Sequence, residues 1–423
     1  MKQKTVLIVG AGITGATVAQ RLSQVGLNVH LIEKQSHIGG HAIEMGCKAT
    51  DKCLRCNICV ANETLRQVAG SESIQIYTRT QLAKLGNGTN GSRYTAVLTH
   101  EPTFISADKC IGCQVCIDVC PEKCISRPVL ADSVTPVIDY SRCRRALGKE
   151  CLKCEQSCPT KAIKMTQDKS ESKIDVDDIV IATGYEPYDP SIDVSYGYGN
   201  GTNVITGIEA ECQLAENAKL TRPSDGRQPG KIAFVQCVGS RTEHVHRQPQ
   251  DAEYCSAVCC AYALRMARQM KHLSADAQVT IFYMDIQNFT KGFDDFYRQC
   301  RNEMTFIRSR PSDIKQNQNG TVTVRFAPQS LPDNTESQIC QQDFDLVVLA
   351  VGIRPRPGAD KLAENLLIPL DEHGFFGVKG ASPLPQTQRE GIFVAGACEW
   401  PKDIQGCIAQ AEAVSAALIN EAK

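Results

Sequence analysis

The residues with the most evident chemistry in this 423-residue chain are its 22 cysteines. The densest run, C-I-G-C-Q-V-C-I-D-V-C-P, begins at Cys110, and a second run ends in the same way at Cys158-Pro159. The spacing C-x2-C-x2-C-x3-C-P is typical of paired [4Fe–4S] clusters, in which the fourth cysteine of each run ligates the other cluster. This crossover predicts one cube on Cys110, Cys113, Cys116 and Cys158, and another on Cys120, Cys143, Cys151 and Cys154.

The run resembles that of bacterial ferredoxins. The gap from Cys143 to Cys151 is longer than the usual two residues, which predicts a small loop there. Zinc is the alternative metal, because C-x-x-C pairs also bind zinc. Zinc has no need of the crossover, so the pattern favours iron.

Two further groups of cysteines lie outside this run. Adjacent cysteines at a helix start can turn toward one centre, so the second group is a candidate cluster site, with buried free thiols as its alternative. The third group has two C-x-x-C steps and can ligate another cube, with a redox-active C-x-x-C pair as its alternative. The second group is Cys237, Cys255, Cys259 and Cys260, and the third is Cys47, Cys53, Cys56 and Cys59. We interpret the other cysteines as ordinary: Cys124, Cys212, Cys300, Cys340, Cys398 and Cys407.

The N-terminal segment carries the signals of a dinucleotide site. An apolar stretch, KTVLIV, leads into Gly10, Gly12 and Gly15, which allow a tight turn, close approach of a pyrophosphate and close helix–strand packing. The helix that follows offers its unpaired N–H groups and its partial positive charge to the phosphates. A second stretch, LNVHLIE, ends at Glu33, where an acidic side chain is expected to bind the ribose hydroxyls.

FAD is favoured over NAD by later segments that resemble two-dinucleotide-binding-domain flavoproteins: KQSHIGG, DDIVIATGYEP (177–187), DLVVLAVGIRP (345–355) and GIFVAGACEWPKD. Such flavoproteins commonly carry Asp after the A-G of the last segment, where this chain has Ala397 and Cys398. We expect Cys398 to face the flavin and the helix near Asp403 to direct its N-terminus at the ring, with Lys402 either adding a charge or lying in solvent. The resemblance implies cofactor binding by Gly10, Gly12, Gly15, Glu33, Lys34, Gly39, Gly40, His41, Thr183, Gly184, Gly396, Ala397, Lys402, Asp403 and Ile404.

Together these elements predict an α/β fold: a thioredoxin-reductase-like flavoprotein with two dinucleotide-binding domains and an inserted bacterial 2[4Fe–4S] ferredoxin module. The second nucleotide-like unit begins at KIAFVQCVGS and lacks G-x-G-x-x-G, so direct NAD(P)H oxidation is not expected. The predicted division is FAD domain 1–104, ferredoxin module 105–168, FAD return strand and linker 169–230, second nucleotide-like domain with a [4Fe–4S] site 231–344, and last part of the FAD domain 345–423.

Composition limits the possible partners and compartment. A net charge of −1 gives no reason to expect nucleic acid or an anionic membrane as a partner. The apolar runs are too short to cross a bilayer, and the start of the chain reads directly into a strand rather than a signal peptide. We therefore expect a cytoplasmic protein, with any membrane link made through a partner, and thiols that bind metal rather than form disulfides.

Three longer segments resemble the A-type subunit of heterodisulfide reductase: YCSAVCC (254–260), VTIFYMDIQNFTKGFDDFY (279–297) and AGACEWPKDI (395–404). The resemblance extends over essentially the whole chain. It implies that the second cysteine group binds an unusual cluster near FAD. Some relatives also carry cysteines after the double glycine, which implies a cluster on the third cysteine group. The chain lacks the N-terminal extension and the C-terminal ferredoxin module of the methanogen-type protein, and its size is similar to the shorter bacterial versions.

The resemblance implies an oxidoreductase subunit in which FAD exchanges two electrons and the clusters pass them on singly, with bifurcation left open. Implied partners are B-type and C-type redox subunits, together with a flavin oxidoreductase, a hydrogenase or a membrane quinone-reactive subunit, and a homodimer within the larger complex. No catalytic acid–base pair or nucleophile is evident. The alternatives are the flavoprotein subunit of a quinone-interacting membrane-bound oxidoreductase of sulfur metabolism, a self-sufficient NAD(P)H oxidoreductase, and a non-catalytic scaffold.

Overall fold

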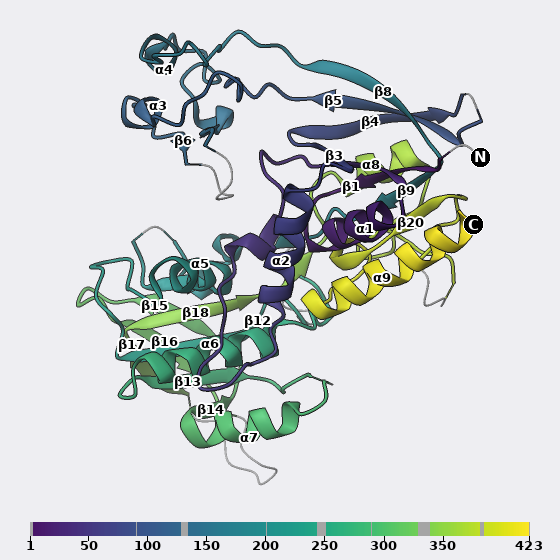
Figure 1. The fold of residues 1–423 in the computed structure, drawn as a ribbon. Coiled ribbons are helices and arrows are strands. Elements are labelled where there is room, and N and C mark those ends of the chain that lie inside the picture. Colours follow the sequence, from purple (N-terminus) through teal and green to yellow (C-terminus); the bar gives the residue numbers. More distant parts are fainter. Residues whose placement is uncertain are drawn as a thin grey trace.

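The computed structural model describes residues 3–89, 91–127, 134–199, 201–242, 251–288, 290–328, 339–380 and 385–422. Figure 1 shows three parts: a nucleotide-binding unit that carries both termini, a second unit below it, and a small insert at the far end of the long strands β5 and β8. The fold therefore has the two sheets and the insert that the sequence predicts.

The first unit is built on a parallel five-stranded sheet in the order β20-β9-β1-β2-β3. Side chains of β1 alternate between its two faces: Val6 and Ile8 share a core with α1, α2 and α9, whereas Leu7 and Val9 share a core with β4, β5 and α8. Because both faces are covered, the strand is almost entirely apolar, as expected for a buried parallel sheet. The bounds are β1 Thr5–Val9, α1 Ile13–Gln24, β2 Asn28–Ile32, α2 Ile58–Ala69, β3 Ile74–Tyr77, β4 Thr80–Asn87, β5 Tyr94–His100, β8 Ser170–Val176, β9 Asp178–Ile181, α8 Ala359–Leu366, β20 Ile392–Val394 and α9 Ile404–Glu421.

The second unit has a parallel sheet in the order β11-β18-β12-β13-β14. Helices α5, α6 and α7 cover one face, and the antiparallel sheet β15-β16-β17 covers the other. The bounds are β11 Val204–Thr206, α5 Gly207–Asn217, β12 Lys231–Val238, α6 Cys259–Leu273, β13 Gln278–Tyr283, α7 Phe293–Glu303, β14 Thr305–Arg308, β15 Asp313–Gln316, β16 Val322–Phe326, β17 Cys340–Phe344 and β18 Leu346–Val351.

This second sheet differs from the division expected from the sequence at both ends. Strand β11 precedes residue 231 and β18 follows residue 344, yet β18 pairs with both β11 and β12. A fully apolar strand such as β18 fits either parallel sheet, so its residues alone do not assign it to one. The chain passes between the units at the antiparallel pair of β10 (Glu186–Pro187) and β19 (Ile353–Arg354).

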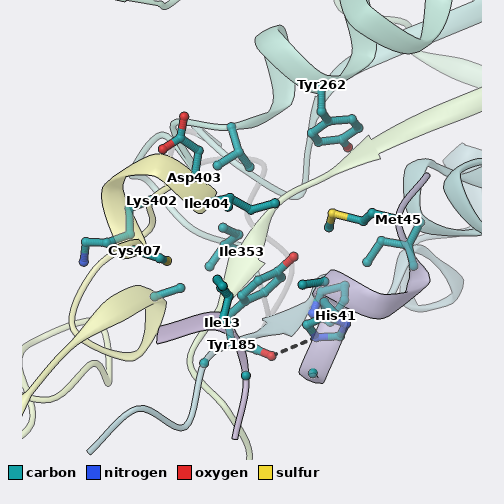
Figure 2. Close-up of a pocket in the computed structure, with 18 of the residues that line it drawn as sticks. Ile13, His41, Met45, Tyr185, Tyr262, Ile353, Lys402, Asp403, Ile404 and Cys407 are labelled. Carbon is teal, nitrogen blue, oxygen red and sulfur yellow. Dashed lines mark hydrogen bonds between the residues drawn. The ribbon is translucent and has the colours of Figure 1, made fainter. Parts of the chain in front are cut away.

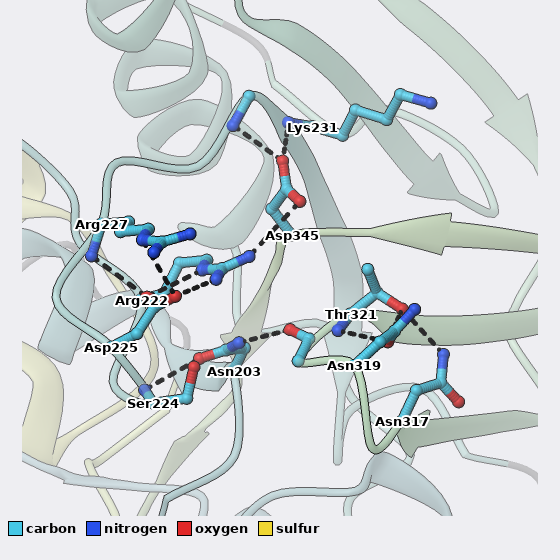
Figure 3. Close-up of polar contacts among 12 residues, drawn as sticks. Asn203, Arg222, Ser224, Asp225, Arg227, Lys231, Asn317, Asn319, Thr321 and Asp345 are labelled. Atoms are coloured by element: carbon cyan, nitrogen blue, oxygen red, sulfur yellow. Dashed lines mark hydrogen bonds and ion pairs between the residues drawn. The ribbon is translucent and has the colours of Figure 1, made fainter.

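A polar network fixes the loops at the amino-terminal edge of the second sheet (Figure 3). The buried Asn203 donates from Nδ2 to the Gly320 carbonyl at 2.7 Å and accepts the Ser224 N–H at 3.1 Å. The Asp345 carboxylate accepts the N–H groups of Gly230 and Lys231, each at 2.8 Å. The starts of β11, β12 and β18 are thereby held together, which leaves their carboxyl ends to face the first unit.

The insert leaves the first unit after β5 and returns at β8. Its two halves each carry a short helix among the cysteines, and they share one small core with Phe104, Ile105 and Ile163. The elements are α3 Val115–Asp118, β6 Ile125–Ser126, β7 Val137–Ile138 and α4 Lys153–Gln156. Figure 1 shows this insert well separated from the second unit.

All 22 cysteines fall in the described part of the chain, and no disulfide joins any two of them there. No helix among the described residues is both long enough and apolar enough to cross a bilayer.

Candidate functional site

A cavity lies where the first unit meets the second, and its empty space, including the part open to solvent, is about 1410 Å³. Residues from α1, from the loop after β9, from the loop before α2, from α6 and from the start of α9 line it (Figure 2). Twelve of the fifteen residues predicted to bind the cofactor are on its wall: Gly10, Gly12, Glu33, Gly39, Gly40, His41, Thr183, Gly184, Ala397, Lys402, Asp403 and Ile404.

The three fingerprint glycines serve different purposes. A Cβ on Gly15 would lie 1.9 Å from the Gly10 carbonyl oxygen, so Gly15 allows α1 to pack closely against the β1 turn. Gly10 has φ of 102°, and a Cβ there would lie 2.4 Å from the Ala182 carbonyl oxygen. A Cβ on Gly12 would meet no atom of the protein within 4 Å. The missing side chain at Gly12 therefore leaves space in the cavity itself and not inside the protein core. A bound pyrophosphate would require that space.

Glu33 is buried at the end of β2 and lines the cavity. Its carboxylate accepts the N–H of Ala11 and the N–H of Gln35, each at 2.8 Å. These bonds fix the carboxylate beside the glycine turn while each oxygen keeps a lone pair. The side chain is thus held in the orientation that a ribose-binding acid needs.

The start of α9 forms another part of the wall. Asp403 caps the helix by accepting the Gly406 N–H at 2.8 Å, which leaves the positive end of the helix dipole at the cavity. The Lys402 ammonium donates to the Gly396 carbonyl at 2.8 Å and to Glu399 at 2.7 Å, and Figure 2 shows it turned away from the centre of the cavity. Lys402 therefore contributes its alkyl chain to the wall, and its charge is paired within the loop.

Aromatic side chains narrow the cavity, and two of them, Tyr185 and Tyr262, were not predicted from the sequence. The rings of His41 and Tyr185 lie 4.7 Å apart, and His41 Nε2 is 3.2 Å from the Tyr185 carbonyl oxygen. Tyr262 lies across from them on α6 (Figure 2). Burial raises the pKa of both phenols well above the ordinary value, so both stay neutral at physiological pH.

A buried ion pair also lines the cavity and joins the two units. Lys48 Nζ lies 2.7 Å from Glu211 on α5, and the two side chains are only 4% and 5% exposed. Lys48 follows the double-glycine loop of the first unit, whereas Glu211 belongs to the second. Burial raises the pKa of Glu211, and the charge of Lys48 opposes that shift.

Expectations about five residues of this region need revision. Cys398 does not line the cavity: its thiol points at the carbonyl oxygens of Ile181 and Ala395, at 3.4 Å and 3.2 Å, inside the core. Cys407, predicted to be an ordinary cysteine, lines the cavity instead. Burial raises the pKa of Cys407 to about 11, so it is a neutral thiol. Among the predicted cofactor residues, Lys34 is exposed to solvent, and Gly15 and Gly396 lie behind the wall.

The insert has two smaller cavities, of about 320 and 350 Å³, with thiols converging on each. One is lined by Cys110, Cys113, Cys116 and Cys158, and the other by Cys120, Cys124, Cys143, Cys151 and Cys154. Burial raises the pKa of Cys154 to about 11, and the neighbouring thiols of Cys143, Cys120 and Cys151 add to this rise. The two sets contain the ligand sets predicted from the crossover, each drawn from both halves of the insert.

Thiols surround these cavities without meeting at a point. Among the described residues, no three His, Cys, Asp or Glu side chains are close enough to hold a single metal ion. Each cavity nevertheless presents the four cysteines that a [4Fe–4S] cube requires.

The second cysteine group lies at the carboxyl end of β12 and the start of α6. Cys237 has φ of 59° where β12 leaves its regular register, a backbone state that is costly outside glycine. Burial raises the pKa of Cys259 well above the ordinary value, and the thiols of Cys237, Cys260 and Cys255 add to this rise. The thiols of Cys237, Cys255 and Cys260 thus all lie within electrostatic reach of Cys259.

The third cysteine group packs against α6, the helix whose first residues belong to the second cysteine group. Arg265 of α6 donates to the Leu54 carbonyl at 2.9 Å, and Gln269 donates to the Cys47 carbonyl at 3.1 Å. Cys56 lines the large cavity, whereas Cys47, Cys53 and Cys59 are exposed.

The second and third groups share one local geometry. Cys53 Sγ accepts the Arg55 N–H at 3.4 Å, and Arg55 has φ of 52°. Cys255 Sγ accepts the Ala257 N–H at 3.4 Å, and Ala257 has φ of 59°. Hydrogen bonds of this kind to cysteine sulfur tune iron–sulfur clusters where such clusters are bound.

The position of a nicotinamide nucleotide in the second unit is filled by side chains. A Cβ on Gly239, just after β12, would lie 2.4 Å from the Tyr188 ring. The Arg354 guanidinium lies 5.2 Å from the centre of that ring. Since nucleotides bind outside the carboxyl ends of parallel strands, this packing agrees with the missing glycine fingerprint.

Comparisons with known proteins agree with this geometry. The 4Fe-4S dicluster domain family matches residues 109–162, and the NAD(P)-binding Rossmann-like domain family matches residues 8–45. The crystal structure of T. acidophilum thioredoxin reductase is similar at a TM-score of 0.51 and 12% identity, over 99% of this chain and 100% of that one. The predicted fold class is thereby confirmed, and FAD and [4Fe–4S] clusters are the cofactors that these matches support.

Several known proteins are similar in sequence to this chain over nearly all of its length. The A-type subunit of the H2:CoB-CoM heterodisulfide,ferredoxin reductase of Methanothermobacter thermautotrophicus is 32% identical over 97% of this chain and 62% of its own length. An A-type iron-sulfur subunit of the CoB-CoM heterodisulfide reductase of Methanopyrus kandleri is 34% identical over 97% of this chain and 63% of its own length. This chain thus spans less than two thirds of each relative. Along nearly all of its own length, the chain is similar to A-type heterodisulfide reductase subunits.

Proposed function

We propose that this chain is the cytoplasmic FAD- and [4Fe–4S]-containing electron-transfer subunit of a heterodisulfide-reductase-like complex. One observation carries the proposal: Cys56 of the third cysteine group lines the same cavity as Gly12 and Glu33. Val258 and Ala261, beside Cys259 and Cys260, line it too. Candidate ligands for one-electron centres therefore adjoin the candidate site of a two-electron carrier.

The residues of the large cavity suit FAD. Gly12 and the N-terminus of α1 would receive the pyrophosphate, and Glu33 would bind the adenosine ribose. The N-terminus of α9, capped by Asp403, would stabilise negative charge on the ring system. His41, Tyr185 and Tyr262 would exclude water from the inner part of the cavity. Bound FAD supplies two-electron redox chemistry.

Four cluster sites follow from the cysteine groups. Two lie in the insert, at the cavities that hold the crossover sets. The second and third groups would hold two more beside the flavin. Electrons would pass between the flavin and these clusters, and the insert, which projects from the body on β5 and β8 (Figure 1), would exchange them with B-type and C-type redox subunits. The disulfide chemistry itself would belong to a partner.

The alternatives make different predictions. A subunit of a quinone-interacting complex would be captured with a membrane cytochrome b. A self-sufficient NAD(P)H oxidoreductase would show rapid bleaching of its flavin by NADH in the isolated chain, and the filled carboxyl end of β12 argues against that. A scaffold would bind no flavin at all.

Anaerobic purification with iron, sulfide and flavin quantitation tests the proposal. Four cubes and one flavin predict about 16 iron atoms and one FAD per chain. About eight iron atoms would restrict the clusters to the insert. A colourless protein, or one that carries zinc, would refute the proposal.

A further inference from the structure

The two halves of the insert end in the same short turn, with two differences in sequence: Glu122 against Thr160, and Cys124 against Ala162. Their sequences are C-P-E-K-C-I and C-P-T-K-A-I. Lys123 and Lys161 are both left-handed, with φ of 46° and 52°. The N–H of Lys123 donates to the Cys120 carbonyl at 3.2 Å, and the N–H of Lys161 donates to the Cys158 carbonyl at 3.1 Å. The next residue is a cysteine in one half and an alanine in the other: Cys124 and Ala162.

The second of these differences places an extra thiol at one cavity. Cys124 and Ala162 are equally buried, at 4% and 3% exposed, and each lines the cavity of its half. The Ala162 N–H donates to Cys158 Sγ at 3.2 Å. On the other side, Cys124 Sγ lies 3.5 Å from Cys120 Sγ. One cavity thus has four thiols and the other has five, in the same backbone frame.

The chemistry of the extra thiol follows from its neighbour. A cysteine that binds iron is a thiolate without a proton, so in the contact between the two sulfurs only Cys124 can donate. A hydrogen bond to a ligand sulfur favours the more negative, reduced cluster and raises its reduction potential.

We propose that Cys124 is a fifth, non-ligating thiol that donates a hydrogen bond to the Cys120 sulfur and sets the two cubes of the insert at different potentials. This inference rests on the iron ligands assigned under the proposed function. The cube held through Cys120 has the higher potential and is reduced first. When the insert exchanges electrons with a partner, this difference in potential favours electron transfer between the two clusters in one direction.

The test is a pair of mirrored substitutions in the anaerobically purified full chain. Cys124→Ala makes the first half like the second, and Ala162→Cys makes the second like the first. The readout is a redox titration of the reduced clusters followed by EPR, with iron counted in every variant. Cys124→Ala is expected to move one midpoint potential to more negative values, and Ala162→Cys to move the other to more positive values. A tenfold change in the oxidised-to-reduced ratio would appear as about 59 mV.

Iron content separates this role from two others. Both variants are expected to keep the wild-type iron content, and Cys124→Ser, which retains a donor, should shift the potential less than Cys124→Ala. Loss of about four iron atoms in Cys124→Ala would make Cys124 a ligand and refute the inference. Full iron with unchanged potentials in both mirrored variants would also refute it. A wild-type insert without iron would instead refute the ligand assignment itself.

Discussion

The ion pair between Lys48 and Glu211 offers the sharpest test of how the two units are joined. Both side chains are nearly inaccessible, at 4% and 5% exposed, and their charged atoms are 2.7 Å apart. The substitution Lys48→Met keeps most of the length of the side chain and removes the charge. Glu211 then remains buried without its partner.

The expected cost is large and depends on pH. Removing one member of a buried ion pair costs about 3–5 kcal/mol, because the remaining charge is uncompensated. Burial already raises the pKa of Glu211 from 4.5, and Lys48 opposes that rise, so the substitution raises it further. When folding raises the pKa of an acid, the folded protein is most stable at a pH low enough for the acid to be protonated in both the folded and the unfolded protein. That stability is lost as the pH rises through the pKa of the folded state. The cost of Lys48→Met is therefore greatest at high pH and shrinks as the pH falls toward the ordinary pKa of the carboxyl.

The assay compares thermal unfolding of wild type and Lys48→Met at about pH 8 and about pH 5. Each kcal/mol lowers Tm by about 2–4 °C in a unit of roughly 150–250 residues. The control is Arg298→Met: Arg298 pairs with Asp295 on the surface, where both side chains are 73% exposed, so it should cost about 0–1 kcal/mol at either pH. A cost for Lys48→Met that equals the control, or that does not change with pH, would refute the reasoning.

Three further predictions follow from the sites. Gly12→Ala should leave thermal stability unchanged and weaken flavin binding, whereas Gly15→Ala should destabilise the fold because its Cβ would lie 1.9 Å from a backbone oxygen; flavin titration and thermal unfolding distinguish them. Cys259→Ser should remove about four iron atoms and leave the flavin, and equal iron content in Cys259→Ser and the control Cys212→Ser would contradict the second cluster. Asp403→Ala removes the cap of α9 and should cost about 0.5–2 kcal/mol in denaturant unfolding; no measurable cost would argue against the cap.

Local motifs in the sequence were enough to predict the elements they form. The glycines before α1 and the acid after β2 belong to one strand–turn–helix–strand unit, so their spacing fixes where they lie. The same holds for the cysteines of the insert, because the crossover is a property of the motif. These predictions needed no knowledge of how distant segments pack.

Contacts between the units were not predictable in this way. Glu211 reaches Lys48, and Tyr262 faces His41, only because the second unit docks against the first. The assignment of β18 failed for the same reason, since an apolar strand does not reveal which sheet it joins.

The error over Cys398 was one of local geometry. Cys398 ends a 3-10 turn, Gly396–Cys398, that directs its thiol into the core. Cys407 lies one helical turn beyond Asp403, on the same face of α9. A helical count from the capping residue would have identified Cys407 as the cysteine at the cavity.

The most direct test of the central claim is an anaerobic reductive titration of the isolated chain, followed by absorbance and EPR. If a flavin and four clusters share the chain, it should take up roughly six electrons, two in the flavin and one in each cluster. Flavin bleaching should be accompanied by signals of reduced [4Fe–4S] clusters. Uptake of only two electrons without a cluster signal, or of none, would contradict the account.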